Sequence, residues 1–493
     1  MDAAVIIVGG GPVGLSLSLG LARYGVRSIV LERNAEPAPE SRAVVIWPRT
    51  QEIFRDWGIY DAVRARSRLV DELIVVNARN ERTLLALDWH VVDDVVENPG
   101  ALIIPQSETE RVLRELVRAN GSCELRTGVT VTGLRQDSEF VDVTYTDGTS
   151  EATVRGTYVA GCDGAHGVVR GLIGLSLQGM TYDTRAVLSD ELLDEDFDDD
   201  VSVRARFDKP NVRGAFKFGD RTWRVIAAVR SDGNDEELLS EDAHRERLRD
   251  LFGDRKTTTL WRSVFKIHKR HAQRFVVGRV ALAGDAAHVN SPAGGQGMNA
   301  GIQDAANLAW KIAYALRGTG DGARLIETFD VERREMVTDT IERYTDRLTR
   351  VGIGFSPRAK QLVIRAVSRA VRGRGMQRKT CRALGMLSGR YTKSPIIDAT
   401  HPLAGRRIDD LRVEDGRRIN EIRKGEPMLV VVGDYALDLP HIALRAPPKR
   451  WHVKAPVVLI VRPDGCVAWV ITKPTRGKIE AAWNTAFCGT KEL

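Results

Sequence analysis

The 493-residue sequence predicts a mixed α/β fold with a Rossmann-like nucleotide-binding domain, an inserted β-sheet domain and a C-terminal α/β module. Three observations predict this fold. A strand, a glycine-rich turn, a helix and a second strand open the chain. Strand-like alternation dominates from about residue 175 to 270, and short strands with turns begin again after about residue 400. This length corresponds to about three domains.

Composition excludes several classes of protein. Hydrophobic residues make up 43% and charged residues 28%, which is typical of a globular protein with a large core. No apolar run reaches the roughly 18 residues of a membrane span. The N-terminus runs directly into a strand, and the five cysteines form no CxxC pair. We therefore expect a cytoplasmic protein with no membrane association, no disulfide framework and no metal site. The net charge of +7 is too thinly spread to indicate nucleic-acid binding.

The first βαβ unit carries a dinucleotide motif. Residues 4–8 are continuously apolar, as in a strand buried on both faces, and a helix is predicted over 15–24. Between them, Gly9 permits a tight turn, Gly11 lets backbone N–H groups approach a pyrophosphate, and Gly14 lets the helix pack closely on the strand. The motif is common to FAD and NAD sites.

The second strand of this unit, residues 26–31, ends at two polar residues. Glu32 follows it at the position where a carboxylate binds the adenosine ribose. We include the adjacent Arg33 among the cofactor-binding residues.

The middle of the chain supplies the predicted substrate face. A helix is expected at 107–120 and a β-meander at 123–160. Residues 190–200 hold eight carboxylates in eleven positions and are predicted to form a solvated loop. The strands beyond them carry the candidate substrate residues Arg213, Phe216, Trp223 and Arg224. Because strand side chains alternate, Trp223 and Arg224 face opposite sides.

A second glycine-rich corner lies far along the chain. The buried strand 279–284 ends at Gly284-Asp285, and Gly294, Gly295 and Gly297 precede a long helix over roughly 299–317. Asp285 can accept a hydrogen bond from a polyol chain, and the glycines bring backbone N–H groups to an electron-rich ring edge. Two such corners 270 residues apart indicate one extended FAD rather than NAD. We interpret the nearby His288 as structural rather than as a general base.

The remaining elements are helical and then mixed. Residues 358–382 hold nine Lys and Arg and no acid, which indicates an amphipathic helix. A solvated helix face explains this segment better than a nucleic-acid or membrane patch. Strands at 428–432 and 457–461 belong to the separate C-terminal module.

Five motifs together resemble the class A flavoprotein aromatic hydroxylases, the superfamily of para-hydroxybenzoate hydroxylase and phenol hydroxylase. The resemblance covers about residues 4–350, and its motifs are the glycine turn 9–14, Glu40-Ser41-Arg42-Ala43, Pro105-Gln106-Ser107-Glu108-Thr109-Glu110, Gly161-Cys162-Asp163-Gly164 and Gly284-Asp285-Ala286-Ala287-His288.

This resemblance assigns roles to individual residues. It implies that Arg42 and Gln106 contact FAD, and that Asp285 holds the ribityl chain. The backbone of Gly297, Met298 and Asn299 would lie beside the flavin ring. Asp163 would hold Arg42 and serve both FAD and NADPH binding.

The C-terminal segment resembles the thioredoxin-like domain of the phenol hydroxylase branch through residues 402–407 and 459–469. Without a CxxC pair it cannot exchange dithiols, so a structural role or a homodimer contact is expected. The predicted domains are 1–174 and 271–395 for FAD, 175–270 for substrate, and 396–493 for this module. We expect deletion of the residues after about 400 to leave the flavin site intact while harming solubility or dimerisation.

The resemblance also implies a reaction. NADPH transiently reduces FAD, O2 adds to give a flavin C4a-hydroperoxide, and a phenolic, polycyclic aromatic substrate is hydroxylated. The Pro292 carbonyl is a candidate to accept a hydrogen bond from the hydroperoxide. Alternatives are a tetracycline- or rifamycin-inactivating monooxygenase, a catabolic phenol hydroxylase and a non-catalytic flavoprotein. A flavin-dependent halogenase is disfavoured because the Trp-x-Trp-x-Ile-Pro motif is absent.

Overall fold

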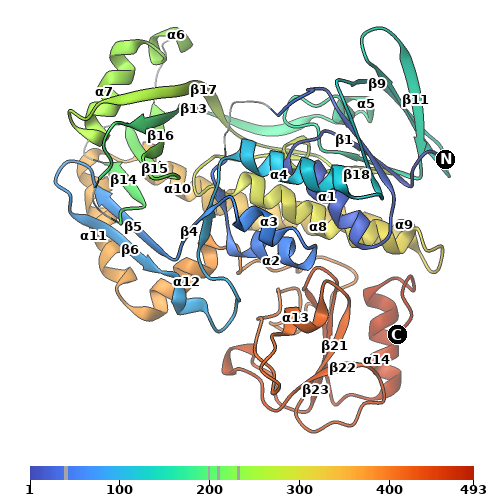
Figure 1. Cartoon of the computed structure of the whole chain (residues 1–493). Helices are drawn as coiled ribbons and strands as arrows, with labels where there is room; N and C mark the ends of the chain where they lie inside the picture. The colour runs from blue at the N-terminus through green and yellow to red at the C-terminus, as the bar shows by residue number, and fades with distance from the viewer. Residues whose placement is uncertain (38–42, 198–199, 208–210, 230–233) are drawn as a thin grey trace.

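The computed structural model describes residues 1–37, 43–197, 200–207, 211–229 and 234–493. Arg42, one of the predicted FAD contacts, lies outside the described residues. In Figure 1 a central body carries a β-sheet body on one side and the C-terminal module below it. The mixed α/β architecture with a Rossmann-like core confirms the predicted fold class.

The central sheet is the predicted parallel sheet. Its strands, in spatial order, are β18 (Val276–Val277), β19 (Val280–Leu282), β12 (Tyr158–Gly161), β1 (Val5–Val8), β2 (Ser28–Glu32) and β8 (Cys123–Thr127). All neighbours are parallel except β18 and β19. Every residue of β1 is buried, as its apolar run predicts. Helices α1 (Pro12–Arg23), α4 (Gln106–Ala119), α8 (Gly297–Ala315) and α9 (Gly322–Met336) pack beside this sheet and one another.

Two small sheets and several short helices complete the central body. The meander consists of β9 (Thr130–Gln136), β10 (Val141–Thr146) and β11 (Glu151–Gly156). The other small sheet has the order β3 (Val45–Ile46), β7 (Ala101–Ile103) and β4 (Arg68–Val70). The short helices are α2 (Pro48–Asp56), α3 (Tyr60–Arg64) and α5 (Val169–Leu172), with 3₁₀ turns at Trp89–Val92 and Gly284–Ala286.

The β-sheet body is one eight-stranded sheet. Its order is β20 (His288–Val289), β17 (Thr257–Ala272), β13 (Leu177–Leu193), β16 (Thr222–Val229), β15 (Val212–Lys217), β14 (Val203–Arg206), β5 (Glu72–Asn77) and β6 (Thr83–Asp88). Strands β5 and β6 come from a part of the chain that the sequence analysis placed with the FAD domain. Strand β5 joins through its parallel pairing with β14.

Helices cover both faces of this sheet. α6 (Asp235–Leu238) and α7 (Glu241–Phe252) cover one face. The other, which we call the inner face, is approached by α10 (Glu342–Gly354). A π-helical turn at Val337–Ile341 joins α9 to α10. The basic segment forms two helices, α11 (Pro357–Val371) and α12 (Arg374–Leu384), rather than one.

The prediction that residues 190–200 form a solvated loop is partly wrong. The first four of these residues continue β13. Asp190 is buried and forms a two-bond ion pair with Arg224, at 2.5 and 2.8 Å, while Glu191 is buried beside His244 of α7. Because each carboxylate has a partner on a neighbouring element, this acidic segment is compatible with a buried strand.

The C-terminal module is a small α/β unit. Its sheet has the order β22 (His441–Leu444), β21 (Met428–Val432), β23 (Val457–Val461) and β24 (Val467–Thr472). The helices are α13 (Ile419–Arg423) and α14 (Arg476–Ala486), with a 3₁₀ turn at Lys449–Trp451. The thioredoxin-like assignment and the exact domain boundaries stay predictions.

Buried charges join this module to the central body. The Arg462 guanidinium donates two hydrogen bonds to Glu332 of α9, at 2.7 and 2.8 Å, and both side chains are fully buried. Burial alone would raise the pKa of Glu332, but Arg462 and Lys311 outweigh it and hold this pKa well below its usual range.

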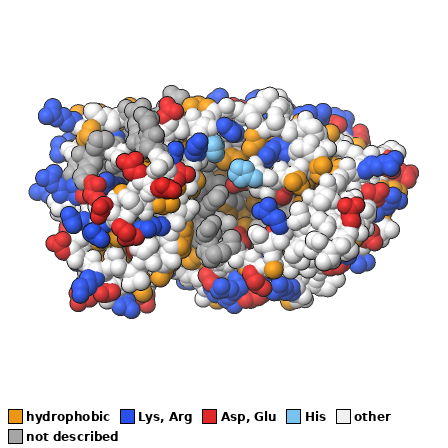
Figure 2. All heavy atoms as spheres, turned by 90° about the horizontal axis from the view of Figure 1, so that it is seen from above, with side chains coloured by type: hydrophobic (Ala, Val, Ile, Leu, Met, Phe, Trp, Pro, Cys, Tyr) orange, Lys and Arg blue, Asp and Glu red, His pale blue; other side chains and the backbone are white. Residues whose placement is uncertain are grey.

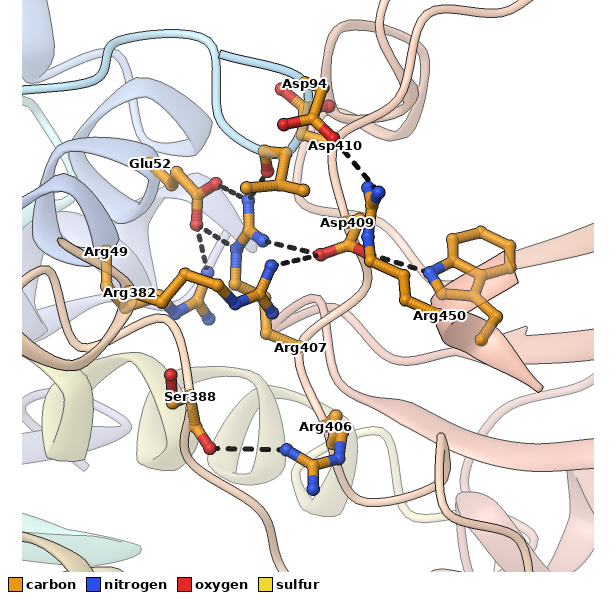
Figure 3. A network of polar contacts seen from close by, with 12 residues as sticks. Arg49, Glu52, Asp94, Arg382, Ser388, Arg406, Arg407, Asp409, Asp410 and Arg450 are labelled. Atoms are coloured by element: carbon orange, nitrogen blue, oxygen red, sulfur yellow. Dashed lines mark hydrogen bonds and ion pairs between the residues drawn. The ribbon is translucent and has the colours of Figure 1, made fainter. Parts of the chain in front are cut away.

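A second cluster of ion pairs crosses the same boundary. Arg407 reaches Glu52 of α2, while Arg382 of α12 and Arg450 converge on Asp409 (Figure 3). One hydrophobic core also runs through β1 and α8 into β21, β23 and α14. These contacts argue against removing the module without effect on the flavin site, because removal would expose this core and take away the partners of buried charges.

Candidate functional site

The first glycine corner is shaped for a close-lying ligand. Gly9 has a φ of +107°, and a Cβ there would lie 2.4 Å from the Cys162 carbonyl oxygen. A Cβ on Gly14 would lie 2.0 Å from the Gly9 carbonyl oxygen. Both glycines are required by packing. A Cβ on Gly11 would meet nothing within 4 Å, and Gly11 starts α1 without a side-chain cap. This open helix N-terminus suits a pyrophosphate.

The end of β2 holds the predicted ribose ligand. The Glu32 carboxylate accepts hydrogen bonds from the backbone N–H of Gly10, at 2.6 Å, and of Asn34, at 2.7 Å. One bond goes to each oxygen, so further lone pairs can accept ribose hydroxyls. Arg33 is exposed beside it, and its predicted cofactor contact stays a prediction.

Asp163 lies on the loop after β12 and has a partly unsatisfied carboxylate. Its Oδ2 accepts a hydrogen bond from the Val169 N–H at 3.0 Å, whereas Oδ1 is buried without a partner among the described residues. Burial raises the pKa of this carboxyl despite the backbone hydrogen bonds. A buried carboxylate oxygen requires a donor. The predicted partner, Arg42, falls outside the described ranges.

Gln106 anchors the chain just after that undescribed stretch. Its side-chain oxygen accepts a hydrogen bond from the Ala43 N–H at 3.2 Å, and its amide group donates to Glu110 at 2.8 Å. Its predicted contact with FAD stays a prediction.

The second corner is held by a buried network. Asp304 of α8 accepts a hydrogen bond from the Gly284 N–H at 2.9 Å, and its carboxylate lies 2.7 Å from His288 and 2.6 Å from Arg333. Burial opposes ionisation of Asp304, but His288 and Arg333 lower its pKa below the usual value. His288 is thus placed as a structural residue. Asp285 is exposed at the turn that this network fixes.

The two corners adjoin in space. A Cβ on Gly284 would lie 2.9 Å from Val13, and a Cβ on Gly301 of α8 would lie 2.5 Å from the same side chain. Val13 is in the first turn of α1. The N-terminal corner and the residue-284 corner therefore pack against each other, as one ligand touching both would require.

The glycine-rich loop is held by side-chain bonds. Asn299 accepts a hydrogen bond from the Trp47 N–H and donates to the Val45 carbonyl, both at 2.9 Å. Gly297 begins α8, and a Cβ there would meet nothing within 4 Å. The backbone at Gly297 is thus open, whereas Asn299 is fully buried, and the predicted contact of Gly297, Met298 and Asn299 with the flavin ring stays a prediction. The Pro292 carbonyl accepts the Gly295 N–H at 3.0 Å, which leaves its second lone pair for the predicted role.

Two of the four predicted substrate residues lie on the face of the sheet that helix α7 covers. Trp223 is fully buried against Phe197 and Phe252, under the helix α7. Arg213 forms ion pairs with Asp250 and Glu246 of α7. Alternation along β15 and β16 places both side chains on the helix-covered face.

Phe216 and Arg224 are paired neighbours on the opposite, inner face. Sequence reasoning missed four further inner-face side chains that are only half-buried. Three of them, Ile226, Trp261 and Phe265, form one apolar wall, with Tyr182 of β13 beside them. Alternation along β13, β16 and β17 is a sequence signal for these side chains, but it does not locate the wall, because the wall depends on which strands pair.

A hollow lies on one face of the molecule, and basic, acidic and histidine side chains surround it (Figure 2). A cavity of about 120 Å³ lies elsewhere, between α8, α9, α12 and the C-terminal module, and includes Gln303, Tyr344 and Met386. Gln296, which stands between Gly295 and Gly297, also lines it, so the cavity borders the second glycine corner.

Neither a metal cluster nor a membrane-spanning helix is found in the described part of the chain. No group of three or more His, Cys, Asp or Glu side chains is placed to bind a metal there. None of its helices has the length and apolar character needed to cross a membrane.

Comparison with known proteins identifies a family, related sequences and a similar structure, and these findings agree with one another. Residues 2–344 match the FAD binding domain family. The chain is 31% identical to a rifampicin monooxygenase of Streptomyces venezuelae, over 94% of this chain and 95% of that protein. It is 30% identical to a para-nitrophenol 4-monooxygenase of Pseudomonas sp., over 67% of this chain and 83% of that protein. An anhydrotetracycline hydroxylase structure from Streptomyces rimosus superposes with a TM-score of 0.80, at 29% identity and 99% coverage of both chains.

Proposed function

Because this chain belongs to the FAD binding domain family of flavin-dependent aromatic monooxygenases, we propose that it hydroxylates a phenolic, polycyclic aromatic substrate with NADPH and O2. The observation that carries this proposal is the packing of the two glycine corners against each other through Val13. FAD, held by the two glycine corners, would supply the oxygen-transfer chemistry once reduced by NADPH.

The chain's own residues bind and position the reactants. The Gly11 corner fits the pyrophosphate, Glu32 the ribose, and Asp285 the ribityl chain. The open backbone at Gly297 fits the flavin ring. The apolar inner face of the eight-stranded sheet would hold the aromatic substrate and exclude water from it.

A polycyclic substrate is supported by the extent of the similarities. Similarity to the rifampicin enzyme covers 94% of this chain, against 67% for the para-nitrophenol enzyme. The rifampicin relative also supports a second candidate function, inactivation of an antibiotic. Catabolic oxidation of a simple phenol is the third. We place the reaction in the cytoplasm, where NADPH is supplied, and a homodimer stays a prediction.

A substrate panel tests this function. Phenols, anthraquinones, tetracyclines and rifamycins are supplied with NADPH, and we expect substrate-stimulated NADPH consumption with a product one oxygen atom heavier. An Asp285→Ala variant is the control, because it should purify without the yellow flavin spectrum. If the wild-type protein consumed no NADPH with any panel member, the monooxygenase function would be refuted and a non-catalytic flavoprotein favoured.

A further inference from the structure

Exposed apolar side chains gather on the helices α11 and α12. Ten large hydrophobic side chains are exposed in the described part of the chain, and four of them, Phe355, Leu362, Val367 and Met376, lie between residues 355 and 376. Leu362 is 65% exposed and Val367 is 48% exposed. Single exposed apolar side chains are ordinary on a protein surface, whereas a group of them marks an interaction site. This segment is therefore a candidate interaction surface.

The same segment carries positive charge that no neighbouring acid in the sequence balances. No Asp or Glu occurs from residue 347 to 397. Two basic residues of α12 have acidic partners elsewhere, since Arg378 pairs with Asp94 and Arg382 pairs with Asp409. Six others are exposed and form no ion pair with any described residue, namely Arg358, Arg365, Arg369, Arg372, Arg374 and Lys379.

The charged and apolar side chains form adjacent rows along α11. Residues three, four and seven positions apart share a helix face, so the exposed arginines at 358, 365, 369 and 372 form one row. Leu362, Ala366 and Ala370, each four positions apart, form an exposed apolar row beside it. At 3.6 residues per turn, Val367 lies beyond this apolar row, on the side away from the arginines. The outward surface of α11 is thus basic along one edge and apolar along the other.

The remaining side of α11 is fixed to the protein. The Ser368 hydroxyl donates a hydrogen bond to the Leu84 carbonyl of β6, and Val371 is buried. Strand β6 is an edge strand of the eight-stranded sheet, and α11 packs along it. In Figure 1 both α11 and α12 lie at the outer edge of the molecule. The two rows are therefore held facing outward.

The chemistry of this surface favours one kind of partner. In a twofold contact with a second copy the surface would meet itself, and the arginine rows would repel each other. A nucleic acid would match the arginines through its phosphates but would leave Leu362 and Val367 without an apolar partner. A bilayer with anionic headgroups offers both a negatively charged surface and an apolar layer beneath it.

We propose that the outward surface of α11, together with Met376 and Lys379 of α12, docks on an anionic membrane surface. The arginine row contacts lipid phosphates, while Leu362 and Val367 enter the boundary between headgroups and acyl chains. Docking places the β6 edge of the sheet that carries the proposed substrate wall next to the bilayer, into which apolar polycyclic compounds partition. The sequence analysis favoured a solvated helix face, and the exposed rows favour its alternative, a membrane patch.

Flotation with lipid vesicles tests this docking on the full-length, FAD-loaded protein, without substrate or NADPH. Vesicles of pure phosphatidylcholine are compared with vesicles of equal parts phosphatidylglycerol and phosphatidylcholine. We expect the protein to bind only the anionic vesicles. High salt should release it, because salt screens the attraction between the arginine row and the headgroups.

Two variants separate the charged row from the apolar one. Arg365→Gln combined with Arg369→Gln should weaken binding about 25-fold, which is about fivefold for each basic residue near an anionic surface. Leu362→Gln should weaken binding about tenfold, because an apolar side chain no longer enters the lipid.

The matched control is Arg27→Gln combined with Arg118→Gln. It removes the same charge from exposed positions on the central body and should bind vesicles like the wild type. Flavin absorbance and the melting temperature show whether each variant is folded.

Three results would overturn the proposal. They are absence of vesicle binding, equal binding to both kinds of vesicle, and equal binding by the wild type and the Arg365–Arg369 variant. If vesicles do not bind, a single-stranded oligonucleotide that binds the wild type but not this variant would identify a nucleic-acid surface instead. A dimer in gel filtration that only the α11 variants dissociate would identify a contact between copies. None of these measurements depends on turnover, so their failure would leave the monooxygenase function untouched.

Discussion

Gly11 and Gly14 belong to one motif but have opposite surroundings, and these surroundings give the two residues different roles. A Cβ at Gly14 would overlap the Gly9 carbonyl, whereas a Cβ at Gly11 would occupy open space. The φ of Gly11, −79°, is one that any residue adopts. The sequence pattern alone does not show this difference, because it depends on what surrounds each backbone position.

We predict that Gly11→Ala folds with an unchanged melting temperature of the flavin-free protein but binds little FAD, because its methyl group occupies the space for the pyrophosphate. Gly14→Ala should instead destabilise the fold itself by about 1–3 kcal/mol. Flavin absorbance per polypeptide and thermal unfolding distinguish the two. Normal FAD content in Gly11→Ala would refute the phosphate role.

Two adjacent aspartates at the module boundary should respond oppositely to pH. Burial and the nearby Glu52 raise the pKa of Asp410 to about 6. Burial opposes ionisation of Asp409 too, but Arg382, Arg407 and Arg450 outweigh it and lower its pKa. Since the folded pKa of Asp410 is above its unfolded value, its stabilisation is complete below that unfolded value and is lost as the pH rises through about 6.

Asp410→Asn should therefore be more stable than the wild type at pH 8, by at most about 3 kcal/mol, and the difference should shrink toward pH 5. Asp409→Asn, the matched control, should be less stable at pH 8 because it loses its ion pairs. Urea unfolding at several pH values measures both. Parallel stability curves for Asp410→Asn and the wild type would contradict the prediction.

At the scale of elements, the two faces of β16 have different roles. One face packs under helices and stabilises the fold, and the other faces the proposed substrate site. The odd-numbered side chains of β16, such as Trp223, are buried under α6 and α7, whereas Ile226 is half-buried on the inner face. Alternation could be predicted from the sequence. Which face is covered by helices could not, because that depends on where α7 and α10 pack.

We expect Trp223→Phe to lower stability by about 1–3 kcal/mol without changing the KM for the substrate, since a buried ring loses volume under α7. Ile226→Ala should change KM while costing less stability, because its side chain is already half-exposed. Urea unfolding and steady-state kinetics on a panel substrate measure the pair. A changed KM in Trp223→Phe alone would reverse the assignment of the faces.

The elements also show where sequence reasoning ends. The buried strand β1 and its glycine turn could be predicted because their residue types act locally. The place of β5 in the large sheet could not, because it depends on pairing with the distant β14. Asp190 and Glu191 are compatible with a strand only through Arg224 and His244, which are also distant in sequence.

At the scale of the whole molecule, the C-terminal module is part of one folded body. Its Arg462 neutralises Glu332, and its strands extend the core of the central body. The motifs alone indicated an appended domain, because buried partners on distant segments leave no local pattern.

A chain ending at residue 395 should not yield a soluble, yellow protein, since Glu332 and Lys311 would be left buried without Arg462. Removing one partner of a buried ion pair costs about 3–5 kcal/mol. Soluble yield, flavin content and resistance to protease measure this. As a control, Arg476→Ala removes only an exposed ion pair with Glu480 and should behave as wild type. A stable, flavin-containing truncated protein would show that the module is independent.

The two-sided construction of β16 has a consequence for how such enzymes diversify. Inner-face side chains can be exchanged while the opposite face keeps its helices in place. New ring shapes can thus be accommodated through changes at a few alternate positions, with little penalty in folding. The same scaffold is then available to select different aromatic compounds, and a library restricted to inner-face positions is the economical way to redirect it.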